Sequence, residues 1–312
     1  MDKLAVIAIG GNSLIKNKGQ VDLKSQLATV KETCRSIAEL VQQGWNVAIT
    51  HGNGPQVGFL IRRAELAVRE LPLIPLEFAV ADTQGAIGYM IQQSLMNEFR
   101  QRGIKKQAVT IVTQVIVDKN DPAFQKPSKP VGSFMTREEA ERHIQEDGWT
   151  VVEDAGRGWR RVVPSPEPRA IVESAAIRDL ITNGYIVICA GGGGIPVIEK
   201  DGQLEGIAAV IDKDYASALL ATEIKASMLV ISTGVSKVAI NFGQPDQKEL
   251  DLLTVAEAEA YLEAGHFPPG NMGPKITAII RYLKNNGGQG LITSPEAIVA
   301  AVAGKAGTRI VP

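Results

Sequence analysis

The chain has 312 residues, and its 33 lysines and arginines almost balance its 34 aspartates and glutamates, giving a formal net charge of -1. This balance argues against a general nucleic-acid or membrane-surface binder, which would carry a basic excess or blocks of like charge. Hydrophobic residues make up 45% and charged residues 21%, the composition of a globular protein that buries a large core. Glycine is enriched, since 31 of the 312 residues make about 10% where ~7% is usual.

The two cysteines, Cys34 and Cys189, lie in apolar stretches and indicate neither a disulfide framework nor a thiolate metal site. The apolar run in the first residues, MDKLAVIAIGG, is too short for a signal peptide. No apolar stretch approaches the ~18 residues of a membrane-spanning helix. We therefore expect a soluble cytoplasmic protein with no membrane and no nucleic-acid partner.

Short apolar runs rich in valine and isoleucine alternate along the chain with longer segments of helical period. In chain order we predict strand 4–9, a helix from about Asp22, strand 46–50, helices 56–68 and 84–99, strand 108–117, helix 174–182, strand 186–190, helix 214–222, strand 228–232, helix 272–284 and strand 290–293. Continuous apolar strands separated by helices indicate a mostly parallel sheet covered on both faces. The predicted fold class is α/β, a three-layer αβα sandwich with an open, mostly parallel central sheet.

Residues 118–168 break this alternation. They are polar and hold six of the 16 prolines and two of the three tryptophans, Trp149 and Trp159. Tryptophans need partners to pack against, so we expect a small inserted subdomain over the sheet edge, with hairpin strands around GRGWRRVV, and not a disordered linker.

The sequence gives little sign of a division into domains. We expect one domain over residues 1–312, with an N-terminal lobe (1–211) that contains the insertion and a C-terminal lobe (212–312). The boundary is expected between a strand that ends at Ile211 and a helix that starts at Asp214.

Three glycine-rich loops follow predicted strands: Gly10-Gly11-Asn12, Gly52-Asn53-Gly54 and Gly191–Gly194. Glycine lets backbone N–H groups approach an anion closely, which is the basis of phosphate cradles. No loop has the Walker A pattern. The first two loops would lie side by side at the carboxyl edge of the sheet, where α/β proteins bind ligands, so phosphate binding is favoured over tight turns alone. His51 is interpreted as a strand-end residue that holds its loop.

Two lysines stand at predicted helix starts, Lys213 between Asp212 and Asp214, and Lys275 in NMGPK. A solvated first turn would explain either one. However, a lysine there opposes the helix dipole, which makes sense if an anionic phosphate occupies the helix N-terminus. Together with the glycine loops, the lysines indicate phosphoryl transfer, where positioning and charge neutralisation supply most of the catalysis.

The segments IAIGGNSL, THGNGPQVG, RRVVPSPEPR, CAGGGGIPVI, AVIDKDYASALLA, VAINFGQP and PGNMGPKI resemble the carbamate kinases of the amino acid kinase family over essentially the whole chain. The resemblance implies an open αβα sheet and reversible phosphoryl transfer, in which ATP and carbamate give ADP and carbamoyl phosphate. It further implies Mg²⁺, a homodimer, and use in making ATP during fermentative arginine or related nitrogen breakdown.

The resemblance also assigns residues. The implied catalytic residues are Gly11, Asn12, Lys129, Lys213, Asp214 and Lys275. Contacts to carbamate and the transferred phosphoryl group are implied for Gly10, Gly11, Asn12, Gly52, Asn53, Gly54, Gly192 and Gly193. Contacts to the nucleotide are implied for Lys213, Thr233, Gly234, Val235, Asn241, Phe242, Met272, Gly273 and Lys275. Lys126 competes with Lys129 as the lysine of the insertion, both could be exposed, and the metal ligands stay unknown.

Two alternative functions remain open. Another kinase of the same fold, acting on a longer acid such as acetylglutamate or on a phosphonate, would need an arginine or amide pair near the second glycine loop. Arg62 and Arg63 are the candidates there, although both could face solvent. A regulatory sensor that binds ATP without catalysis is the other alternative, and the presence of Lys213, Asp214 and Lys275 speaks against it.

Overall fold

The computed structural model describes residues 3–11, 14, 22–154, 156–268 and 270–312. Its central sheet has eight strands in the order β15-β17-β16-β12-β1-β2-β9-β3. The strands are β1 (Leu4–Ile9), β2 (Asn46–His51), β3 (Ala108–Thr110), β9 (Ile186–Ile188), β12 (Met228–Ser232), β15 (Leu252–Thr254), β16 (Gln289–Thr293) and β17 (Thr308–Val311). The six strands from β3 to β16 are parallel, while β17 runs antiparallel to β16 and β15 is parallel to β17.

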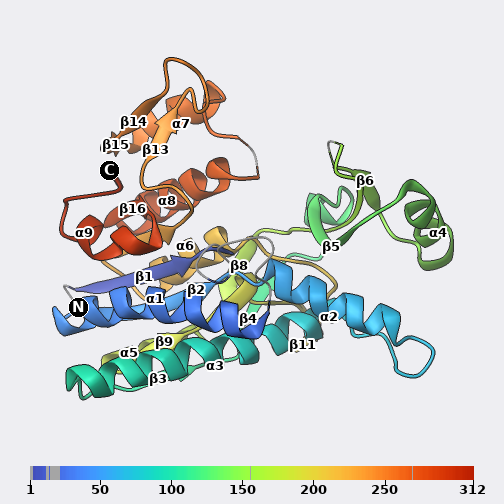
Figure 1. The fold of residues 1–312 in the computed structure, drawn as a ribbon, viewed down its shortest axis with the longest axis horizontal. Helices are drawn as coiled ribbons and strands as arrows, with labels where there is room; N and C mark the ends of the chain where they lie inside the picture. The colour runs from blue at the N-terminus through green and yellow to red at the C-terminus, as the bar shows by residue number, and fades with distance from the viewer. Residues whose placement is uncertain (1–2, 12–13, 15–21, 155, 269) are drawn as a thin grey trace.

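Helices cover both faces of this sheet (Figure 1). On one face Ile7 and its neighbours pack against α1 (Leu23–Gln42), α3 (Leu76–Arg102) and α9 (Ile298–Val302). On the other face Val6 and its neighbours pack against α5 (Ser174–Thr182), α6 (Lys213–Glu223) and α8 (Met272–Asn286). Successive residues of β1 are buried on opposite faces, which explains its continuous apolar sequence. The predicted three-layer sandwich is confirmed.

A second sheet, separate from the central one, has four strands. It contains β11 (Gln203–Gly206), β10 (Ile195–Lys200), β4 (Gln114–Val117) and β8 (Pro168–Ile171), in that order. The prediction of one strand over 108–117 is therefore wrong, because β3 and β4 belong to different sheets. The chain leaves the first sheet where the backbone N–H of Thr113 donates to the side chain of Gln84 (2.8 Å) and the Thr113 hydroxyl donates to the carbonyl of Ile111 (2.9 Å).

The expected strand ending at Ile211 is also absent. Residues 207–212 lie outside the strands: the N–H of Ile207 donates to the carbonyl of Pro196 at the end of the β10–β11 pairing, and that of Val210 donates to the carbonyl of Pro164. Helix α3 begins at Leu76, directly after Pro75, and so starts earlier than predicted. The other predicted elements agree with the structure within a few residues, including α2 (Gly54–Leu66).

The insertion stands away from the main body, on the side of α2 (Figure 1). It contains η2 (Pro122–Phe124), β5 (Lys129–Met135), α4 (Arg137–Asp147), β6 (Val151–Glu153) and β7 (Trp159–Val163), with the antiparallel strand order β5-β7-β6. The predicted hairpin is β6-β7. Trp149 stacks on His143, with 4.1 Å between the ring centroids, and Cζ of Arg161 lies 4.5 Å from the centroid of the tryptophan ring. The described part of the insertion thus has a small sheet and a helix of its own.

The remaining elements lie in the C-terminal third. They are the hairpin β13 (Val238–Ile240) and β14 (Lys248–Leu250), helix α7 (Val255–Glu263) and the short turn η4 (Pro295–Ala297). Among the described residues, none of the helices has the length and apolar character needed to cross a membrane.

Candidate active site

The carboxyl ends of the parallel strands meet at one pocket of about 210 Å³. It is lined by residues of the second and third glycine loops, by the start of α6, by the loop before α8 and by the first residues of β5. The lining residues include Asn53, Gly54, Lys129, Gly192, Asp212, Lys213, Asp214, Asn271 and Lys275. Segments far apart in the chain thus bring three lysines into one pocket, as the sequence predicted for Lys129, Lys213 and Lys275.

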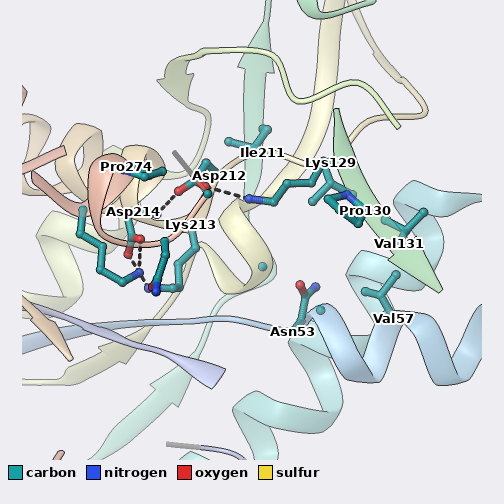
Figure 2. Close-up of a pocket in the computed structure, with 16 residues that line it drawn as sticks. Asn53, Val57, Lys129, Pro130, Val131, Ile211, Asp212, Lys213, Asp214 and Pro274 are labelled. Atoms are coloured by element: carbon teal, nitrogen blue, oxygen red, sulfur yellow. Dashed lines mark hydrogen bonds and ion pairs between the residues drawn. The ribbon is translucent and has the colours of Figure 1, made fainter. Parts of the chain in front are cut away.

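Asp214 is the centre of the charged group in this pocket. Its Oδ1 accepts from Nζ of Lys213 (2.5 Å; Figure 2), and its Oδ2 accepts from Nζ of Lys275 (2.8 Å). The exposed fractions of the three side chains are 5% for Asp214, 14% for Lys213 and 15% for Lys275. One carboxylate therefore holds two nearly buried ammonium groups side by side.

The pKa shifts in this group follow from burial and from the neighbouring charges. Burial alone would raise the pKa of Asp214, but the ammonium groups of Lys213 and Lys275 outweigh it and hold this pKa below its ordinary value. Burial lowers the pKa of Lys213, Lys275 lowers it further, and Asp214 opposes both effects. The carboxylate is ionised at neutral pH, and the group has one more positive than negative charge when both lysines are protonated.

Lys129 enters the pocket from the insertion. It is the first residue of β5, and its Nζ donates to Oδ2 of Asp212 (2.8 Å; Figure 2). Lys126, the alternative lysine, is exposed and does not line the pocket. Of the two candidates, Lys129 is the one that the fold brings to the other lysines.

The third glycine loop is packed against protein atoms. It forms the short turn η3 (Gly191–Gly193), and a Cβ added to Gly192, whose φ is +69°, would lie 2.1 Å from Nδ2 of Asn53. A Cβ on Gly193 would lie 2.3 Å from the carbonyl oxygen of Ile211. Gly192 lines the pocket and Gly193 does not. The close approach of Asn53 and Ile211 leaves no room for a Cβ, so packing alone requires glycine at these two positions.

Three buried polar residues that the sequence analysis missed hold these loops. Nδ2 of Asn53 donates to the hydroxyl of Thr83 (2.8 Å). The side-chain amide of Gln84 donates to the carbonyls of Gly191 (3.0 Å) and Thr113 (3.1 Å). The hydroxyl of Thr113 in turn accepts from the N–H of Ala190 (2.9 Å). A signal was available for Gln84, because it falls on the buried face of α3 in register with apolar residues at helical spacing.

The first glycine loop touches the second, which lies close to Lys213. The N–H of Gly52 donates to the carbonyl of Ile9 (3.1 Å), so the two loops touch where β1 and β2 end. A Cβ on Gly10 would lie 2.8 Å from the carbonyl oxygen of Ser232, and one on Gly52 would lie 3.8 Å from the side chain of Lys213. Gly11 is exposed. Asn12, predicted to be catalytic, lies outside the described residues.

A second cavity of about 220 Å³ adjoins the first and shares Asn271 with it. Its lining includes most of the predicted nucleotide residues, namely Thr233, Gly234, Val235, Phe242 and Met272. Asn241 does not line it, because its side chain donates to Asp246 (2.6 Å), and Gly273 is buried beneath it against the carbonyls of Phe267 and Pro268. The described residues thus form a strongly charged pocket and, next to it, one with fewer charged side chains.

His51 is buried beside the pocket. Its Nδ1 lies 3.0 Å from the carbonyl oxygen of Gly52, and burial lowers the pKa of His51 to about 4. A neutral ring that donates to its own loop agrees with the interpretation of His51 as a structural residue.

The fold and the site define a phosphate-binding α/β protein, and comparison with known sequences gives its family. The family model for the amino acid kinase family matches residues 3–294, and the chain belongs to this family.

Individual relatives cover nearly the whole chain. It is 51% identical to a carbamate kinase of Thermococcus kodakarensis, over 99% of both chains. It is also 51% identical to a carbamate kinase-like protein of Escherichia coli, over 100% of this chain and 99% of the relative. The solved structure of a carbamate kinase from Giardia lamblia bound to AMP-PNP superposes with a TM-score of 0.94 at 41% identity, over 99% of this chain and 98% of that one.

The packing of Gly192 against Asn53 can be tested by substitution. We expect Gly192→Ala to lower the free energy of unfolding by at least about 2 kcal/mol, because the new Cβ meets the side chain of Asn53 at a positive φ. Urea unfolding measures this change. Gly54→Ala is the matched control, since no described residue lies within 4 Å of its Cβ position, and it should change stability by less than about 0.5 kcal/mol. Equal stability of the two variants would contradict the packing.

The burial of His51 predicts a pH dependence of stability. Its folded-state pKa lies below the unfolded value of 6.5, so the unfolded chain binds the proton more tightly, and stability present above pH 6.5 is lost as the pH falls toward 4. The shift corresponds to about 3 kcal/mol. We expect His51→Gln to flatten the slope of unfolding free energy against pH in this window, measured by urea unfolding. An unchanged slope would show that His51 is not the group responsible.

Proposed function

We propose that this chain is a carbamate kinase, catalysing ATP + carbamate = ADP + carbamoyl phosphate. The observation that carries the proposal is the group formed by Asp214, Lys213 and Lys275 at the glycine loops, with Lys129 reaching it from the insertion. The full-length similarity to carbamate kinases supports it. In this proposal the enzyme works in the cytoplasm and makes ATP from carbamoyl phosphate in fermentative arginine or related nitrogen breakdown.

The proposed mechanism is a direct in-line transfer. In the direction of ATP synthesis, an oxygen of the ADP β-phosphate attacks the phosphorus of carbamoyl phosphate, a new P–O bond forms, and the bond to the carbamate oxygen breaks with its electron pair leaving on carbamate. No proton has to move, because both oxygens are anionic before or after the step. Lys213 and Lys275 neutralise the phosphoryl charge, and backbone N–H groups of the glycine loops supply further donors.

Asp214 organises the two lysines in this mechanism. Two ammonium groups repel each other, and burial disfavours both of them. The shared carboxylate offsets both effects and fixes the direction of each Nζ, so the lysines are in place before substrate arrives. Gly10, Gly11, Gly52, Asn53, Gly54 and Gly192 are proposed to surround carbamate and the phosphoryl group, with Asn12 and Gly193 assigned from the resemblance alone.

The second cavity is proposed to hold the nucleotide. Thr233, Gly234, Val235, Phe242 and Met272 line it, and its shared wall at Asn271 would let the phosphates extend toward Lys213 and Lys275. The C-terminal lobe (212–312) then binds the nucleotide, the N-terminal lobe (1–211) binds carbamate, and the insertion acts as a lid that supplies Lys129.

Mg²⁺ is proposed to enter with the nucleotide phosphates. The described residues contain no group of three or more histidine, cysteine, aspartate or glutamate side chains arranged for a metal. Both carboxylates that line the pocket, Asp212 and Asp214, are in ion pairs with lysines. A hard cation carried by phosphate oxygens and water fits this donor set better than a site built from protein ligands.

The geometry disfavours the alternatives from the sequence. Arg62 and Arg63 are exposed, Arg62 pairs with Glu65 in its own helix, and neither lines the lysine pocket, so they offer no site for a longer acid. A non-catalytic sensor would have no need for the lysine pair held by Asp214.

A homodimer is proposed through the outer face of α3. Phe78 and Tyr89 on this helix are 61% and 62% exposed, although both are large and apolar. The helix packs against the edge strand β3, where Gly88 approaches Thr110, and among the described residues β3 pairs on one side only in the central sheet. A second copy of the chain would cover the apolar face and the strand edge together.

An assay of ATP formation from ADP tests the activity. We expect turnover with carbamoyl phosphate and much less with acetyl phosphate. We expect Lys275→Met to lower kcat by about 10² to 10³, the usual cost of losing one preorganised donor. Near-normal turnover in a folded Lys275→Met protein would refute the assigned role, and equal use of both acyl phosphates would refute the substrate.

The two lysines of the insertion provide a matched pair for the same assay. Lys129→Met should lower kcat/KM for carbamoyl phosphate, because its Nζ is in the pocket, whereas Lys126→Met should leave activity unchanged. A loss of kcat/KM in Lys126→Met with none in Lys129→Met would assign the role to Lys126.

The dimer proposal predicts that Tyr89→Arg shifts the protein from dimer to monomer. Sedimentation velocity measures the change, and Leu252→Arg, at a 59% exposed position of β15 at the opposite end of the central sheet, would be the control. A dimer that survives Tyr89→Arg would place the interface elsewhere.

A further inference from the structure

Asp212 uses both of its carboxylate oxygens, and it uses them on different parts of the chain. Oδ1 accepts from the backbone N–H of Asp214 (2.8 Å) and so caps the N-terminus of α6. Oδ2 accepts from Nζ of Lys129 (2.8 Å), 83 residues away in the insertion (Figure 2). A single side chain thus joins the lysine of the insertion to the turn that carries Lys213 and Asp214.

A cap alone does not account for this arrangement. Capping needs one oxygen, which Asn, Ser or Thr would supply equally well. The cap of α1 illustrates the difference, since Asp22 accepts from the N–H of Ser25 with Oδ1 and from the hydroxyl of the same serine with Oδ2. Both oxygens of Asp22 stay within one turn, whereas the second oxygen of Asp212 goes to another subdomain.

Lys129 needs such a partner to have a fixed position. Its side chain is 36% exposed and has four rotatable bonds, so an unpaired ammonium group would sample many rotamers. The ion pair with Asp212 occupies one of its three N–H donors and leaves two for another anion. Because Asp212 is bonded to the backbone of α6, the position of Lys129 is fixed relative to Lys213.

We propose that Asp212 is a positioning residue for phosphoryl transfer, which holds Nζ of Lys129 in register with the group of Lys213, Asp214 and Lys275. The inference rests on the proposed function of the site and extends it to a residue that does not itself need to touch substrate. Loss of the carboxylate should leave the helix capped and the lysines present, with Lys129 no longer fixed. Small misplacements of a positioned group cost up to about 10²-fold in rate.

The test compares Asp212→Asn with Lys129→Met and with the double variant. Asn keeps a cap acceptor for α6 and removes the charge. We expect Asp212→Asn to lower kcat/KM for carbamoyl phosphate by about 10- to 100-fold with little change in the urea midpoint. In the Lys129→Met background, the same substitution should have no further effect. An undiminished effect in that background, or no effect in the wild type, would overturn the proposal.

Two controls separate this role from others. Asp22→Asn makes the same chemical change at the cap of α1, where both carboxylate oxygens bond within one turn, and should leave kcat/KM unchanged. The Mg²⁺ concentration for half-maximal activity should be the same in Asp212→Asn and wild type, and a large increase would show that Asp212 holds the metal instead.

Hydrogen exchange reports on the contact independently of activity. Without the ion pair, amides at the start of β5 should exchange faster in Asp212→Asn than in wild type or Asp22→Asn, and equal rates would overturn the proposal. The two proposals can fail separately. If the β5 amides exchange faster in Asp212→Asn but the wild-type protein forms no ATP from carbamoyl phosphate, the proposed function is refuted and the Asp212–Lys129 contact is supported.

Discussion

The structure of the site depends on one buried carboxylate shared by two lysines. Burying Lys213 or Lys275 alone would be costly, and placing them together adds their mutual repulsion. Asp214 makes the arrangement possible, provided that α6 and α8 keep their first turns close together. They do so because both helices pack their apolar sides on the same face of the central sheet, in one continuous core. The core therefore sets the geometry of a charged group that lies at its edge.

The local charge explains how an almost neutral protein can hold an anion. Asp214 with its two lysines has a net charge of about +1, while Lys129 and Asp212 cancel each other. The total of 33 basic and 34 acidic residues hides this difference. A pocket that excludes most water strengthens such a charge, so a few placed lysines can bind a small phosphate compound without any basic excess in the chain.

The sequence predicted the parts of the site that have a local signature. Glycine loops after strands and lysines at helix starts stand out from their immediate neighbours, and the alternation of elements gave the sandwich. Gln84, Thr113 and the second bond of Asp212 were not predicted, because their partners lie far away in the chain. The break between β3 and β4 was missed for the same reason, since the side chain that ends the first strand comes from α3. The packing of Gly192 and Gly193 against Asn53 and Ile211 likewise needs the three-dimensional structure.

Two kinds of contact fix the insertion, and they have different consequences. Val57 and Ile61 of α2 pack against Val131 and Val163 of the insertion, and Gly58 lets the two backbones approach closely. Apolar contacts of this kind hold a sheet in place but are not directional, so they leave the end of a long side chain undetermined. The ion pair of Lys129 with Asp212 supplies the missing direction. An insertion that contributes one lysine to a site needs both kinds of contact. The apolar contacts position its backbone, and the ion pair positions the ammonium group of the lysine.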